Sequence, residues 1–258
     1  MKTKKEKEYL KKYLNAIQKH LKDFLQSQDQ EALHQFRVQV KKTRSLLVLL
    51  EDGGDNKKLL RLFKPVKKVF KKAGSIREAY IHLRLGDQHH LHNDAFGKQQ
   101  QQVVEKGTEA FCDKGHKHLH HLKKAKVKLN KAIHHIDNAG IQAFYNKTLN
   151  EIAEFLAQPV FDEGLHQCRK QIKYLLHNRK LAAKEVESLS FNTDYLDELQ
   201  EMIGKWHDNL LAIELFSSSE SEKASANNEI KAHNAELQKK ITDKVVRFQE
   251  KVRTQALQ

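Results

Sequence analysis

The sequence predicts an all-α protein. Three observations favour this class: the 258 residues include only 2 Pro and 10 Gly, good helix formers (Leu, Lys, Gln, Glu and Ala) dominate, and apolar residues recur at helical spacing almost from end to end. Runs of β-branched residues are few, which disfavours a sheet protein. The length suits one large domain or two smaller ones.

Helices are predicted in the first part of the chain over residues 4–26, 30–50, 56–72 and 76–86. Asp52-Gly53-Gly54 is a stop signal after the second helix. Pro65 either kinks the third helix or marks a restart, and we expect Gly74-Ser75 to separate it from the fourth. A His- and Gln-rich stretch follows at 88–102.

Helical patterns continue over residues 103–136, 141–157, 159–188, 191–217 and 222–255. Pro159 opens one of these helices, residues 192–194 form a cap region, and 217–221 is a polar break. Eight or nine helices with short connections indicate two packed bundles. We place the approximate halves at 1–100 and 101–258, the second with a C-terminal helix.

The charge of the chain restricts its partners. A formal net charge of +14 favours phosphate-rich partners: nucleic acid, an anionic membrane or a free polyphosphate chain. Only two cysteines occur, Cys112 and Cys168, so a reducing compartment is expected. The N-terminus lacks a secretory apolar segment, and no apolar run approaches the ~18 residues of a membrane span. The prediction is a cytoplasmic protein that does not contact membranes.

A cationic helix motif occurs twice. Residues 33–41 align with 165–173 at an offset of 132, and six of the nine pairs are identical, including the His, Arg and Lys of His-x-x-Arg-x-x-x-Lys. Downstream, Gly74-x-x-Arg77-Glu78 aligns with Gly204-x-x-His207-Asp208 at an offset of 130. Two matched elements at nearly the same spacing predict an internal duplication.

The helical wheel places the motif cations beside the apolar stripe, not opposite it. At about 100° per residue, one arc of about 80° holds His34, Arg37, Lys41 and Arg44. The second copy repeats this arc with His166, Arg169 and Lys173. Clustered like charges are costly unless an anion compensates them, and Arg presents a planar fork that matches phosphate oxygens. The pattern therefore predicts a groove or cavity that binds a polyanion.

A third basic helix is expected to form a second wall of this site. The i, i+3, i+7, i+10 spacing of the first motif recurs in Arg61, Lys64, Lys68 and Lys71. No acidic residue occurs between Lys57 and Arg77.

These paired motifs resemble the CHAD (conserved histidine α-helical domain) family. The resemblance rests on His34-Gln-Phe-Arg37-Val-Gln-Val-Lys41-Lys42-Thr-Arg44, its copy at 166–174, and residues 199–208. It covers nearly the whole chain, which is read as a single CHAD domain over 1–258. It implies two four-helix bundles related by a pseudo-two-fold axis with an additional helix, and inorganic polyphosphate bound in a basic channel where the halves meet.

The resemblance and the third basic helix together give the expected polyphosphate-binding residues. These are His34, Arg37, Lys41, Arg44, Arg61, Lys64, Lys68, Lys71, Arg77, His166, Arg169, Lys170, Lys173 and His207. Glu78 and His207 stand where the family more usually has Asp and Asn, and fewer basic residues follow Tyr174 in the second motif. Weaker binding by the second half is therefore expected. Sulfate, phosphate and other polyanions are further expected ligands.

Other functions receive less support. The sequence shows no nucleophile–base set and no cluster of carboxylates, so a non-catalytic module without a cofactor is expected. His116 and His120 are spaced to share a helix face, but without accompanying Glu or Cys ligands no metal site is expected. A basic helical nucleic-acid-binding protein is the alternative, although few aromatic residues interleave with the basic runs. An adaptor that binds proteins through residues 222–255 is a third possibility.

Overall fold

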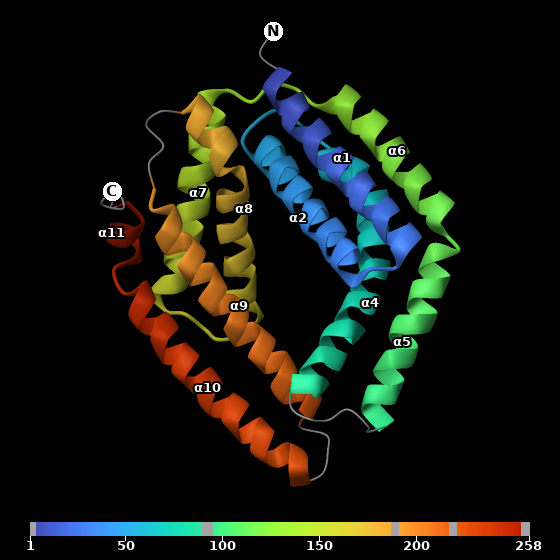
Figure 1. Cartoon of the computed structure of the whole chain (residues 1–258). Coiled ribbons are helices and arrows are strands. Elements are labelled where there is room, and N and C mark those ends of the chain that lie inside the picture. The colour runs from blue at the N-terminus through green and yellow to red at the C-terminus, as the bar shows by residue number, and fades with distance from the viewer. Residues whose placement is uncertain (1–3, 89–94, 187–190, 217–220, 254–258) are drawn as a thin grey trace. The chain divides into compact units, whose positions relative to one another are not determined.

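The computed structural model describes residues 4–88, 95–186, 191–216 and 221–253 (Figure 1). These residues form eleven helices and no strand, which confirms the all-α prediction. The chain divides into two compact units, residues 1–136 and 137–258. The boundary differs from the one expected near residue 100, because the helices on either side of residue 113 pack against the helices that precede them.

Unit 1 contains five long helices and one short one: α1 (Lys4–Ser27), α2 (Gln30–Asp52), α3 (Leu59–Leu62), α4 (Lys64–Gln88), α5 (Ala95–Cys112) and α6 (Gly115–Ala132). Helix α1 packs against α2 and α6, and α4 packs against α2, α5 and α6. The buried stripe of α1 consists of Leu10, Leu14, Ile17, Leu21 and Phe24, at the alternating spacing of four and three that one helix face requires. The core of unit 1 therefore lies between α1, α2, α4 and α6.

Side chains fix the ends of several helices in unit 1. Asp29 caps α2, since its carboxylate accepts a hydrogen bond from the Ala32 amide at 2.9 Å. After α2, the buried Asn56 donates to the carbonyl oxygen of His134 at 3.1 Å and accepts from the amide of the same residue at 2.5 Å. The connection between α2 and α3 is thereby joined to the segment that follows α6.

A second polar contact joins the beginning and the end of unit 1. The buried carboxylate of Glu6 accepts a hydrogen bond from the Ile136 amide at 3.2 Å, and one of its oxygens lies 2.6 Å from Nδ1 of His135. Helix α1 and the last residues of the unit are thus held together directly.

The expected helix pattern in unit 1 is wrong at two places. Gly74-Ser75 does not separate two helices, because α4 runs without interruption from Lys64 to Gln88. Pro65 lies in the first turn of α4, where its missing N–H removes no hydrogen bond, so it marks a restart. The expected single helix over 103–136 is interrupted at Asp113-Lys114, between α5 and α6. Part of the His- and Gln-rich stretch, residues 89–94, lies outside the described residues.

Unit 2 contains four long helices and one short one: α7 (Asn138–Ala157), α8 (Glu163–Glu185), α9 (Thr193–Phe216), α10 (Ser221–Val245) and α11 (Phe248–Arg253). Helix α8 packs against α7 and α9, α10 lies along α9, and α11 contacts α7 and α9 (Figure 1). Trp206 and Tyr145 are the largest fully buried side chains of this unit, and the Tyr145 hydroxyl donates to the Leu175 carbonyl at 2.8 Å. The expected helix over 222–255 is interrupted before α11, where Arg247 has a φ of 55°.

Candidate anion-binding sites

The Arg37 guanidinium is fixed between α2 and α4. Its Nη1 donates to the carbonyl oxygen of Phe70 at 2.9 Å, and its Cζ lies 4.3 Å from the centroid of the Phe70 ring. A Cβ atom at Gly74 would lie 2.8 Å from Nη1 of Arg37. Glycine therefore stands inside α4 because a guanidinium occupies the space of its side chain. Burial lowers the pKa of Arg37, and this effect is opposed by the nearby Glu78.

His34 and Arg77 lie beside Arg37. Burial and then the charge of Arg77 lower the pKa of His34, so its imidazole is neutral at pH 7. Nη1 of Arg77 makes only a long contact, 3.5 Å, with the Gln30 carbonyl, and its Nε is buried without a hydrogen-bond partner. Arg77 therefore makes few hydrogen bonds within the protein, and a bound anion would accept from its terminal Nη donors, not from the buried Nε.

The other predicted cations of unit 1 are more exposed. Lys41 and Arg44 continue along α2 from the Arg37 position, and Arg61, Lys64, Lys68 and Lys71 are exposed on α3 and α4. On the α4 wheel Lys68 lies about 120° from Gly74. It acts electrostatically on His121 of α6. The four residues expected as a second wall are therefore not all directed to the Arg37 side of α4, because Lys68 lies close enough to α6 to act on His121.

Unit 2 repeats the arrangement around Arg37. Nε of Arg169 donates to the Gln200 carbonyl at 2.9 Å, and a Cβ atom at Gly204 would lie 2.5 Å from its Nη2. In both units the accepting carbonyl belongs to the residue four positions before the glycine. We call this arrangement the Arg–Gly clamp: Arg37 with Phe70 and Gly74, and Arg169 with Gln200 and Gly204.

His166 and His207 form a close pair beside the second clamp. Their ring centroids are 4.1 Å apart, and Nδ1 of His166 is buried without a hydrogen-bond partner. Burial, followed by the charges of His207 and Lys170, lowers the pKa of His166 to about 4. At neutral pH this ring is uncharged.

Acidic residues accompany the remaining cations of unit 2. Burial lowers the pKa of Lys173, as does Arg169, whereas Asp197, Asp208 and Glu201 oppose this shift. Lys170 forms an exposed ion pair with Glu163 at 3.4 Å. The predicted residues His166, Arg169, Lys170, Lys173 and His207 all belong to α8 and α9, but their positive charge is partly neutralised. Asp208 belongs to the repeated motif, but the acidic neighbours Asp197, Glu201 and Glu163 and the two accepting carbonyls were not expected from the sequence. The carbonyls do have a sequence signal, because each belongs to the residue four positions before a motif glycine.

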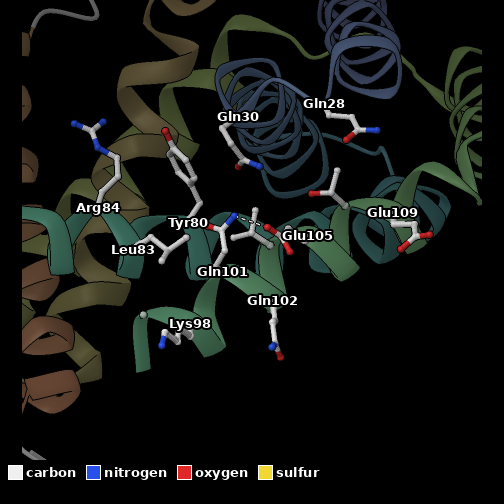
Figure 2. Close-up of a pocket in the computed structure, with 13 residues that line it drawn as sticks. Gln28, Gln30, Tyr80, Leu83, Arg84, Lys98, Gln101, Gln102, Glu105 and Glu109 are labelled. Carbon is white, nitrogen blue, oxygen red and sulfur yellow. Dashed lines mark hydrogen bonds between the residues drawn. The ribbon is translucent and has the colours of Figure 1, made fainter. Parts of the chain in front are cut away.

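A separate cavity of about 980 Å³ lies in unit 1. Residues of α4 and α5 line it together with the connection into α2, and Figure 2 shows Gln30, Gln101 and Gln102 among them. Nε2 of Gln101 donates to Glu105 at 2.6 Å. Two carboxylates, Glu105 and Glu109, and two cations, Arg84 and Lys98, line this cavity, so it lacks the excess of positive charge that a polyanion requires.

No group of three or more potential metal ligands occurs among the residues that the structure describes. Within the same residues, no helix has the length and apolar character needed to cross a bilayer.

A family model and a solved structure match the chain. The family model described as CHAD domain matches residues 8–217. A crystal structure of the CHAD domain from the plant Ricinus communis superposes with a TM-score of 0.66 at 16% identity, covering 95% of this chain and 91% of that one. At this identity the likeness shows the fold alone. No curated protein matches the sequence.

Proposed function

The chain belongs to the CHAD domain family, and on that premise we propose that it is a non-catalytic module that binds inorganic polyphosphate. The observation that carries the proposal is the Arg–Gly clamp, which occurs in each unit. A guanidinium has five N–H donors, and the clamp uses one of them for the helix carbonyl. The clamp fixes the plane of the guanidinium, so that the other donors are oriented before an anion arrives.

The electrostatic surroundings favour an anionic ligand. Burial lowers the pKa of Arg37 and Arg169, which means that both positive charges have lost part of their hydration. Phosphate oxygens restore hydrogen bonds and opposite charge to such groups. After burial, the charge of Arg77 contributes most to the lowered pKa of His34, and Lys170 contributes to the lowered pKa of His166. Both rings therefore lie near positive charges that would also attract an anion.

A chain of phosphates fits the spacing of the cations better than a single phosphate does. Along α2, Lys41 lies about 10 Å and Arg44 about 15 Å from His34 at the helical rise of 1.5 Å per residue. One phosphoryl group cannot contact the whole row. The surroundings of the Arg–Gly clamp in unit 1 contain fewer acidic residues than those of the clamp in unit 2. We therefore assign to unit 1 the larger part of the affinity for polyphosphate.

Binding of fluorescently labelled long-chain polyphosphate to the full chain tests the proposal. The informative variant combines Arg44→Gln with Arg77→Gln, because Arg37 and Arg169 also support packing. We expect the affinity to fall about tenfold or more, since two phosphate contacts are removed. A matched control, Lys12→Gln with Lys19→Gln on the exposed side of α1, removes the same charge and is expected to change affinity less than about twofold.

Competition identifies the ligand class. Unlabelled polyphosphate should displace the probe far better than duplex DNA or RNA at equal phosphate concentration. Absence of binding, equal loss in the α1 control, or equal competition by nucleic acid would each overturn the proposal.

A further inference from the structure

The positive charge of the chain is concentrated in two segments of unit 1. Residues 56–77 and 114–136 together contain sixteen Lys and Arg residues and no Asp or Glu. The whole chain has a formal net charge of +14, so the remainder is close to neutral. A local excess of this size is an electrostatic footprint for a polyanion.

The fold brings these two segments together. Helix α6 packs against both α3 and α4. His118 of α6 is 3% exposed and has Lys72 as its principal charged neighbour, and Lys68 acts on His121 one turn away. The basic side of α4 therefore lies beside the basic side of α6.

The lysines of α4 continue around the helix from the Arg–Gly clamp. Measured from Gly74 on the wheel, Lys71 lies at about 60°, Lys64 at about 80°, Lys68 at about 120° and Lys72 at about 160°. All four are exposed, and beyond them Lys117 and Lys124 are exposed on α6. We call these six residues the lysine track: Lys64, Lys68, Lys71, Lys72, Lys117 and Lys124.

The lysine track has no internal counter-charge. Within the described part of the chain none of its six members forms an ion pair, although ion pairs occur elsewhere, as between Lys147 and Glu151. The two segments also expose no Trp, Tyr or Phe, since Phe63 is buried and Phe70 is half-buried. The exposed rings of these segments are histidines, such as His116 and His120, so the track offers charge without exposed Trp or Tyr for bases to stack on.

We propose that the lysine track is a second polyphosphate-contact surface, which binds the part of a long chain that extends beyond the Arg37 site. This inference rests on the proposed function. The track passes around about 100° of the α4 surface before it reaches α6. A flexible single chain can follow that curvature, whereas duplex DNA is stiff over about 150 base pairs and would touch one side only. The consequence is preference for long chains over short ones.

The test compares two ligands on the full chain: tripolyphosphate and long-chain polyphosphate. The track variant combines Lys72→Gln, Lys117→Gln and Lys124→Gln, all at exposed helical positions where Gln is tolerated. We expect about a tenfold or greater loss of affinity for the long chain and less than about a twofold loss for tripolyphosphate. The control variant, Lys12→Gln with Lys19→Gln and Lys22→Gln, removes the same charge from α1 and should leave both affinities almost unchanged.

The outcomes separate the two proposals. If the unmodified chain binds neither ligand, the proposed function fails and this inference with it. If the long chain binds equally well to the track variant and the α1 control, the track inference is overturned while the proposed function stands. Loss of duplex DNA binding without loss of polyphosphate binding would assign the track to nucleic acid and also overturn the inference. Circular dichroism verifies that helicity is retained, and Lys117→Gln alone provides a milder variant.

Discussion

Replacing Gly204 with Ala tests whether the Arg–Gly clamp exists as described. The new methyl group would lie 2.5 Å from Nη2, 2.8 Å from Cζ and 3.0 Å from Nε of Arg169. These atoms cannot remain so close, so the guanidinium must move away from Gly204. Its hydrogen bond to the Gln200 carbonyl is then lost.

The expected magnitude follows from two opposing effects. Gly→Ala inside a helix normally stabilises by about 1 kcal/mol. Loss of a hydrogen bond from a charged donor costs about 1.5–3 kcal/mol. We therefore expect a net destabilisation of about 0.5–2 kcal/mol, opposite in sign to the usual effect of this substitution.

Urea unfolding followed by circular dichroism measures this change in the full chain. The control is the same substitution in an Arg169→Ala background, where no guanidinium is present and Ala should stabilise by about 1 kcal/mol. If Gly204→Ala stabilises equally with and without Arg169, the clamp does not constrain this position and the reasoning is refuted. Gly74→Ala with Arg37→Ala provides the same cycle in unit 1.

Further substitutions test the titration and the buried hydrogen bonds. Burial lowers the pKa of folded His166 to about 4 from 6.5, so the unfolded state gains a proton first as the pH falls. The free energy of unfolding is therefore highest above pH 6.5 and decreases as the pH falls toward 4. His166→Asn should reduce the loss of unfolding free energy between pH 7 and 5, and an unchanged pH dependence would contradict this. Tyr145→Phe should destabilise by about 1 kcal/mol in urea unfolding, because the buried hydrogen bond to the Leu175 carbonyl is lost, and an unchanged midpoint would show that this bond contributes nothing. Asn56→Ala should cost about 2–4 kcal/mol, since both backbone groups of His134 lose their partner, whereas a cost below about 0.5 kcal/mol would show that water replaces the amide.

The helices were largely predictable from the sequence because apolar periodicity is a local property. The exceptions have tertiary causes. Gly74-Ser75 has the composition of a helix end, yet α4 continues through it, and glycine stands there because Arg37, distant in sequence, occupies the space of its side chain. The break at Asp113-Lys114 lies within a continuous apolar pattern; Asp113 and Gly115 are typical turn residues, and a Cβ atom at Gly115 would lie 3.0 Å from the Leu25 side chain.

The candidate sites were predictable where the residues repeat and not where they depend on neighbouring helices. His34 and Arg37 lie together, as do their counterparts in unit 2, because their positions follow from the geometry of one helix. A single wheel cannot show which helix packs on each flank, and Lys68, which was expected at the same site, also acts electrostatically on His121 of α6. The internal duplication stays a prediction, although the clamp recurs in both units.

The contact between Glu6 and Ile136 has a consequence for how the chain can be rearranged. It places the two ends of unit 1 within hydrogen-bond distance of each other, and Asn56 holds the same end through His134. A short linker could therefore join residue 136 to the start of α1 without disturbing any helix, and new termini could be opened at the exposed Asp113-Lys114 turn. Unit 1 is accordingly a suitable subject for circular permutation, with α6 becoming its first helix.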